Sequence, residues 1–252
     1  RCAARGTRSR GAPAVGDGHQ LVGVAEVDRL AGVEVPRLDD YVAGASAYVR
    51  RAVVLDQGPK KAAQIRLSAA LAEALKAELQ ERLPGMSHAH AGERDVGGAL
   101  RVARADLSEM HPLDGLRLGV ELKPIHLAVG RNLWNRFGDI RTFAVNLHLK
   151  FPFAVVGGVL TVPSYEWVTR GGRAERKSTI GLVERAVARV SRAGGRRNEG
   201  DAPHLLEAAA VVVFDPDGDR LRDDTPPRGS GLRWDEFVGA MAAAYDARVG
   251  DR

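Results

Sequence analysis

The residues best suited to chemistry lie in the segment VELKP at positions 120–124. Because side chains alternate between the two faces of a strand, Glu121 and Lys123 would share one face and one small site. Asp106 lies fifteen residues before Glu121, a separation that a hairpin can close. Two carboxylates are the hard oxygen ligands that Mg²⁺ prefers, and the ion keeps water in its other positions. Lys123 beside that water would favour hydroxide and stabilise charge on a phosphate oxygen, so the three residues predict phosphodiester hydrolysis.

Two alternatives stay open at this point. Asp114, in HPLDG, could be the first metal acid, although Asp114-Gly115 is also a natural turn tip, and we therefore prefer Asp106. Glu121 and Lys123 could also be a solvated ion pair on an exposed hairpin edge. The apolar residues before Glu121 instead indicate a core position, where a Glu and a Lys are costly unless they are paired or liganded.

Hydrophobic periodicity indicates the elements that would position these residues. Leucines at a spacing of four predict a helix over 62–83, ended by Pro84-Gly85. Alternating segments at 99–107 and 116–122 predict an antiparallel hairpin, and nearly all-apolar segments at 153–162 and 208–214 predict buried strands. Further helices are expected over 38–55, 128–148, 178–193 with Ser178 as a cap, and 234–249. This order predicts an α/β fold with a mixed sheet.

Asp106, Glu121 and Lys123, in this order of helix, hairpin, helix and strand, resemble the PD-(D/E)xK nuclease superfamily and, within it, the type II restriction endonucleases. The resemblance in topology covers about residues 62–167, and Asn132 and Asn135-Arg136 on the next helix look similar to residues of some of these enzymes. One position departs from the pattern, because Ala105 and not Pro precedes Asp106.

The resemblance implies a restriction-endonuclease-like core, a mixed central sheet flanked by helices, that cuts double-stranded DNA with Mg²⁺ and leaves 5′-phosphate ends. Asp106, Glu121 and the carbonyl of Leu122 would hold the metal, and Lys123 would orient the attacking water. It also implies a homodimer and a possible cognate methyltransferase encoded elsewhere. A repair or junction nuclease of the same fold and a non-catalytic DNA-binding protein remain as alternatives.

Three basic or polar surfaces are candidates for DNA contact. The helix after Ser178 carries Arg185, Arg189 and Arg192 on one stripe, which Arg196 would extend, and arginine makes bidentate contacts with phosphates. The helix over 128–148 has a polar face that could read bases, formed by Arg131, Asn132, Asn135, Asp139, Thr142 and Asn146. The segment 169–178 is expected to be a flexible basic loop. Solvated helix faces and a plain linker are the corresponding alternatives.

Composition and charge set the limits of these expectations. The chain has 252 residues and a net charge of +5, which is ordinary for a globular protein. The charge is uneven: residues 170–197 hold nine basic and two acidic residues, and residues 198–252 hold six and twelve. Residues 1–20 are expected to be a disordered lead or a fragment boundary, and 21–252 a single nuclease-like domain.

Cys2 is the only cysteine, which excludes internal disulfides and multi-cysteine metal sites. No apolar run reaches the length of a membrane span, so we expect a cytoplasmic protein without a membrane partner. His88 and His90 are expected in a loop and not in a zinc site, and DPDGD at 215–219 in a hairpin turn and not in a calcium loop. The absence of G-x-G-x-x-G, of the P-loop motif and of G-x-S-x-G disfavours dinucleotide enzymes, P-loop NTPases and α/β-hydrolases.

Overall fold

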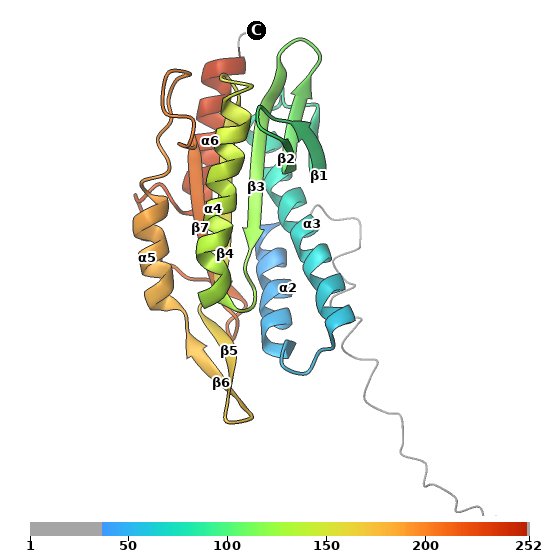
Figure 1. Ribbon diagram of the computed structural model, residues 1–252, viewed down its shortest axis with the longest axis vertical. Helices are drawn as coiled ribbons and strands as arrows, with labels where there is room; N and C mark the ends of the chain where they lie inside the picture. Colours follow the sequence, from blue (N-terminus) through green and yellow to red (C-terminus); the bar gives the residue numbers. More distant parts are fainter. Residues whose placement is uncertain (1–36, 251–252) are drawn as a thin grey trace, which may run out of the picture. The chain divides into compact units, whose positions relative to one another are not determined.

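The structure is a computed structural model that describes residues 37–250. Its main sheet has six strands in the order β1-β2-β3-β4-β7-β8 (Figure 1). These strands are β1 (Ala89–Gly97), β2 (Val102–His111), β3 (Gly115–Pro124), β4 (Val155–Pro163), β7 (Ala208–Asp215) and β8 (Arg220–Leu221). A separate two-stranded sheet pairs β5 (Tyr165–Arg170) with β6 (Arg173–Ser178). The predicted α/β class with a mixed sheet is confirmed, because β1, β2 and β3 are antiparallel whereas β3, β4 and β7 are parallel.

Helices cover both faces of the main sheet. One layer consists of α2 (Leu38–Arg51), α3 (Gln57–Arg82) and α6 (Trp234–Val249), and the other of α4 (Val129–His148) and α5 (Ile180–Val190). Because β4 and β7 lie between the two layers, they are apolar on both faces, as the sequence predicts for them.

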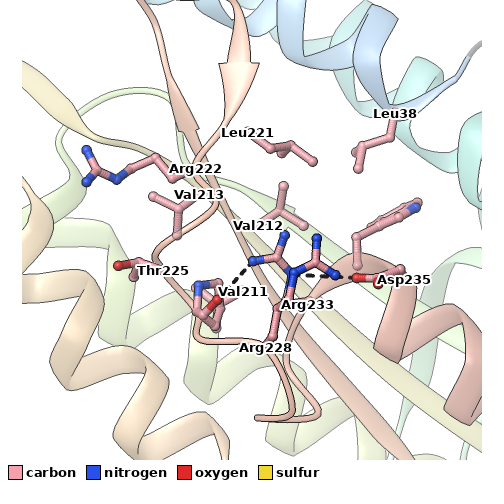
Figure 2. Close-up of a pocket in the computed structure, with 12 residues that line it drawn as sticks. Leu38, Val211, Val212, Val213, Leu221, Arg222, Thr225, Arg228, Arg233 and Asp235 are labelled. Atoms are coloured by element: carbon pink, nitrogen blue, oxygen red, sulfur yellow. Dashed lines mark hydrogen bonds and ion pairs between the residues drawn. The ribbon is translucent and has the colours of Figure 1, made fainter.

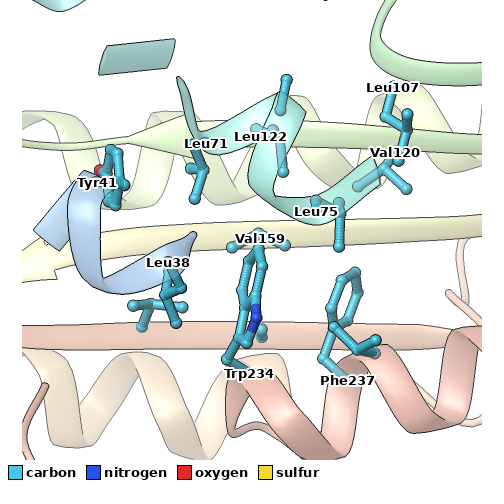
Figure 3. Close-up of a cluster of buried hydrophobic side chains, with 14 of the residues drawn as sticks. Leu38, Tyr41, Leu71, Leu75, Leu107, Val120, Leu122, Val159, Trp234 and Phe237 are labelled. Carbon is cyan, nitrogen blue, oxygen red and sulfur yellow. The ribbon is translucent and has the colours of Figure 1, made fainter. Parts of the chain in front are cut away.

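On the α3 side of the core, the leucines that recur every four residues in the sequence all lie on the buried face of the helix. The leucines Leu67, Leu71, Leu75 and Leu79 form one buried stripe on α3. Figure 3 shows Leu71 and Leu75 packed toward Leu122 and Val120 of β3, with the aromatic rings of α6 beside them. This packing fixes the helix against the strand that carries Glu121 and Lys123.

The structure corrects several local predictions. His90 lies in edge strand β1, not in a loop, and residues 169–178 form most of the β5–β6 hairpin, not a flexible loop. Both missed regions are exposed strands, which need no apolar face and therefore show no alternation. The hairpin closes at Gly171-Gly172, where φ values of +55° and +80° are ones that glycine adopts at no steric cost. Residues 215–219 do form the turn between β7 and β8.

The predictions for the N-terminal segment cannot be compared with the described residues, whereas the prediction about membrane spans can. The lead at 1–20, its boundary with the domain and Cys2 lie outside the described residues. No helix within residues 37–250 has the length and apolar character that crossing a membrane requires.

Candidate active site

The candidate site lies where β2 and β3 part. Their pairing begins with Leu107 opposite Val120, so Asp106 and Glu121 stand one position beyond the last paired residues. β3 continues alongside β4 here, with Glu121 opposite Gly158. Oδ2 of Asp106 accepts a hydrogen bond of 2.6 Å from the backbone N–H of Leu122. A side-chain carboxylate thus bridges the two strands where their backbones separate, which brings Asp106 beside the Glu121–Lys123 segment.

Glu121 and Lys123 share the face of β3 that alternation predicts, and they form an ion pair through Oε1 of the carboxylate. The Glu121 side chain is only 10% exposed, so this is not the exposed edge pair of the alternative interpretation. Its second oxygen, Oε2, is buried without a hydrogen-bond partner among the described residues. A buried carboxylate oxygen without a donor is costly, and such an atom is where a ligand would be stabilising.

Electrostatics at the site reflect this shortage of donors. Burial raises the pKa of the Glu121 carboxyl to about 7, although the Lys123 ammonium acts to lower it, and the charge of Asp106 raises it further. Burial also raises the pKa of Asp106, against the hydrogen bond from Leu122 and the charge of Lys123. The two carboxyl groups therefore repel each other in a partly dry site, which is the arrangement that a bound cation relieves.

Gly158 lets α4 approach the sheet beside Glu121. A Cβ at this glycine would lie 2.3 Å from Cγ2 of Ile140 on α4, closer than real contacts allow. The helix therefore rests directly on the β4 backbone, opposite the strand position of Glu121. The site is bounded on this side by rigid elements, which suits a catalytic arrangement.

Two hollows open beside the end of β3. The larger, of about 770 Å³, lies between α3 and α4, and Asp106, Lys123, Gln64, Asn132 and Arg136 are among its lining residues. Glu121 lines a smaller hollow of about 280 Å³ against the other part of α4, with Asp139 and Thr142. Asp106 and Lys123 thus line the larger hollow, which has room for a phosphate group, whereas Glu121 lines the smaller one.

The floor of the larger hollow includes a buried histidine that sequence reasoning missed. His126 follows Lys123 by three residues and accepts or donates a hydrogen bond of 3.0 Å with the Tyr41 hydroxyl, which also bonds Thr161. Burial lowers the pKa of His126 to about 4, so the ring is neutral at pH 7. This contact holds the chain just after Lys123. A single apolar-flanked histidine carries no sequence signal for such a role.

Asp114, the alternative first acid, lies elsewhere. It precedes β3 at the hairpin turn and binds Arg117 at 2.5 Å. Seven strand positions separate it from Glu121, on the order of 23 Å at the rise of a strand. Asp106 is therefore the acid that the structure brings together with Glu121 and Lys123. Among residues 37–250, no group of three or more His, Cys, Asp or Glu side chains is placed so that it could hold a metal ion.

The DNA-contact residues that were predicted on one polar face of α4 do not share one surface. Asn132 lines the larger hollow and donates to the carbonyl of Leu127, Arg131 lines a neighbouring hollow, and Asn135 is exposed on α4. Asn146, expected on the same polar face, is instead buried, because it bonds the backbone of Leu100 and Arg101.

The arginine stripe of α5 is shorter than predicted and lies on the other side of α4 from the larger hollow. Arg185 is exposed, Arg189 lies over the ring of Trp134 at 4.3 Å, and Arg192 follows the end of the helix. Arg196 does not extend the stripe: it is buried and pairs with Glu207 at 2.9 Å.

A different pocket lies at the β7–β8 end and holds no acid–lysine arrangement. Figure 2 shows its apolar floor of Val211, Val212 and Val213 with Arg222, Arg228 and Arg233 around it, in a volume of about 220 Å³. Two of these arginines already donate hydrogen bonds within the protein. Arg222 donates to the Asp224 carboxylate, and Arg233 donates to the carbonyls of Asp223 and Pro226. The acid–lysine arrangement that the sequence predicts therefore lies at the β2–β3 site and not in this pocket.

Comparison of the chain with protein-family models, with curated proteins and with solved structures finds no match. The functional argument rests on the geometry of Asp106, Glu121 and Lys123.

Proposed function

We propose that this protein is a Mg²⁺-dependent endonuclease of double-stranded DNA with a core of the restriction-endonuclease type. The observation that carries the proposal is the meeting of Asp106, Glu121 and Lys123 at the point where β2 and β3 separate, beside an open hollow. Around them the chain runs α3, β1–β2–β3, α4 and β4, which includes the order of helix, hairpin, helix and strand on which the resemblance depends.

The residues present fit Mg²⁺. Glu121 has a buried oxygen without a donor, Asp106 has a second carboxylate oxygen beyond the one bound to Leu122, and Leu122, whose carbonyl would be a third ligand, directly follows Glu121 in the chain. Two carboxylates with water at the other positions are a sufficient protein contribution for this ion. When bound, Mg²⁺ would polarise a phosphate oxygen and lower the pKa of a coordinated water.

The chain's own residues would do the remaining work. The Lys123 side chain is 20% exposed; its ammonium binds the Glu121 carboxylate, and the residue also lines the larger hollow. There it would hold the attacking water in place and stabilise the charge that develops on the phosphate oxygen. Asn132 and Arg136 line the same hollow and would position the phosphate for attack.

The resemblance to type II restriction endonucleases also implies partners for this chain. A homodimer that reads a palindromic site, a cytoplasmic location and a cognate methyltransferase encoded elsewhere follow from the resemblance alone. A repair or junction nuclease would use the same three residues and differ in the DNA it selects. The pattern of products distinguishes these two roles.

The test is digestion of supercoiled plasmid with and without Mg²⁺. We expect Mg²⁺-dependent cutting into discrete fragments, loss of at least about 100-fold in rate for Asp106→Asn, and no loss for the matched acid control Asp114→Asn. Cutting only at junctions or flaps would favour the repair role. Equal cutting by Asp106→Asn and wild type would remove Asp106 from the site, and no cutting by wild type on any DNA would reject the nuclease proposal.

A further inference from the structure

The hairpin β5–β6, called the arm below (residues 165–178), is an exposed basic projection near the candidate site. Every residue of β6 is exposed, and the arm carries the cations Arg170, Arg173, Arg176 and Lys177. Figure 1 shows it extending past the carboxyl ends of β3 and β4, which is the end of the sheet that holds Glu121 and Lys123.

One face of the arm attaches it to the body of the protein. Trp167 donates from Nε1 to the carbonyl of Val49 at 3.0 Å. Arg176, opposite Trp167 in the register, lies over the Tyr165 and Trp167 rings and binds Asp217 at 2.6 Å. The arm is thus held in a defined position, and Arg176 is occupied in holding it.

The other face presents cations. Register and alternation place Arg170, Arg173 and Lys177 on the face that also carries Glu166. Glu166 accepts a 2.6 Å hydrogen bond from the N–H of Val129, so this face is directed toward the first turn of α4. Arg170 and Arg173 form no ion pair with the described residues, whereas Lys177 lies 3.9 Å from Glu166.

This cationic face continues into the candidate site. A hollow of about 740 Å³ lies between the arm and the starts of α3 and α4, lined by Lys60, Arg131 and Lys177 among others. Leu127 lines both this hollow and the larger one that contains Asp106 and Lys123. Lys61 on α3 stands in the larger hollow next to Lys60 in the chain, so basic side chains follow the path from the arm to the site.

We infer that the arm is a clamp for the phosphate backbone of duplex DNA, with Arg170 and Arg173 at its end contacting phosphates outside the reacting position. Each six-residue strand of the arm spans about 20 Å. Phosphates of one DNA strand recur about every 3.4 Å along the helix axis, so an arm of that length passes several of them. The inference rests on the proposed function for the choice of duplex DNA as the partner.

Glu175 provides an internal check, because it lies on the cationic face between Arg173 and Lys177 and would repel a phosphate. Neutralising it should act in the direction opposite to removing the arginines. The charge pattern of this one face therefore predicts both a loss and a gain of affinity.

The experiment is fluorescence anisotropy of a labelled duplex of about 30 base pairs with the full chain, in EDTA so that no Mg²⁺ is present, over a range of salt concentrations. The double variant Arg170→Ala/Arg173→Ala should weaken binding on the order of tenfold at 0.1 M salt and reduce the slope of log K against log salt by about 1.8, since each phosphate contact contributes about 0.9. Glu175→Gln should bind more tightly than wild type. The matched control Arg197→Ala/Arg228→Ala removes two exposed arginine charges that lie outside the arm, outside both hollows beside it and outside the predicted DNA-contact residues, and it should leave the slope near the wild-type value.

The outcomes separate this inference from the proposed function. Unchanged affinity and slope in the arm variant, or an equal loss in the control, would overturn the clamp even if wild type cuts plasmid with Mg²⁺. Normal plasmid cutting with a reduced salt slope in the arm variant would support both. Failure of wild type to bind the duplex would overturn the clamp. If wild type binds but does not cut plasmid, and the arm variant shows the predicted loss of duplex affinity, only the nuclease proposal is rejected.

Discussion

Two buried glutamates, one on β3 and one just before β7, lie at the strands on either side of β4 and differ in how many hydrogen-bond donors they meet. Glu207, just before β7, accepts from the backbone of Val156 at 2.8 Å, and its carboxylate also contacts His148, Arg196 and Arg248 at 2.7–3.1 Å. Glu121 on β3 meets Lys123 alone and leaves one oxygen without a partner. Both side chains are 10% exposed or less.

The pKa values follow from this difference. Burial raises the pKa of both carboxyls and is the largest single effect at Glu207, but there the hydrogen bonds from His148 and Val156 and the charges of His148 and Arg248 together outweigh it, and the net shift of the pKa is downward. At Glu121 burial prevails and the pKa rises to about 7. The chain is therefore able to satisfy a buried carboxylate fully where the role is structural. At Glu121 it leaves one carboxylate oxygen without a partner, which is the feature that the proposed Mg²⁺ site explains.

The largest expected effect on stability is at Glu207. Glu207→Gln leaves the buried Arg196 and the largely buried Arg248 without their anion, so we expect the free energy of unfolding to fall by about 3–5 kcal/mol. Urea denaturation followed by circular dichroism measures this change. A loss below about 1 kcal/mol would mean that the Glu207 network is not the structural counterpart that the comparison requires.

The same substitution at Glu121 should have the opposite sign. At pH 8 and without Mg²⁺, Glu121→Gln removes a buried negative charge that has Lys123 as its one partner and leaves one oxygen without a donor, so we expect a gain of about 1 kcal/mol in stability. The variant should fail to cut DNA. The same urea titration tests stability, and destabilisation comparable to that of Glu207→Gln would show that Glu121 is a structural residue.

The gain in the free energy of unfolding that we expect for Glu121→Gln should depend on pH. Because the folded-state pKa of Glu121 is about 7 and its ordinary value is 4.5, the native state holds an extra proton between these values. Wild-type stability from this group is therefore lost as pH rises through that window, and the advantage of Glu121→Gln should grow from about pH 4.5 to 7 and then level. An advantage that is constant from pH 4 to 8 would contradict a raised pKa.

The smallest expected effect is a shift in the pH midpoint of DNA cutting when the Mg²⁺ concentration changes. A metal ion binds only the ionised carboxylate, so Mg²⁺-dependent cutting should rise with pH, and a tenfold higher Mg²⁺ concentration should move the midpoint to lower pH by less than one unit. Rates of plasmid cutting from pH 5.5 to 8.5 at two Mg²⁺ concentrations measure the shift. A midpoint that is independent of Mg²⁺ would separate the titrating group from the metal ligands.

Local patterns predicted the central elements well. The helix α6 matches its predicted range, and the hairpin and the two buried strands lie within a few residues of theirs, because apolar periodicity reports burial directly. The pairing of Glu121 with Lys123 also followed from local alternation, since the two residues are neighbours on one strand face.

Residues whose partners are distant in sequence were predicted less well. Arg196 looked like the end of an exposed stripe, but Glu207 draws it into the core. Asn146 looked solvated, but it bonds a turn 45 residues away in the chain. Neither partner is visible in local spacing. The arm was missed as structure because its cations and exposed strands resemble a linker.

The most direct test of the central claim is the rate at which Lys123→Ala cuts supercoiled plasmid at saturating Mg²⁺, beside wild type and the exposed-lysine control Lys150→Ala. If Lys123 stabilises developing charge at the site, its removal should slow cutting at least about 100-fold and leave duplex binding largely unchanged, while the control cuts at the wild-type rate. Cutting by Lys123→Ala at the wild-type rate would contradict the account and place the chemistry elsewhere in the chain.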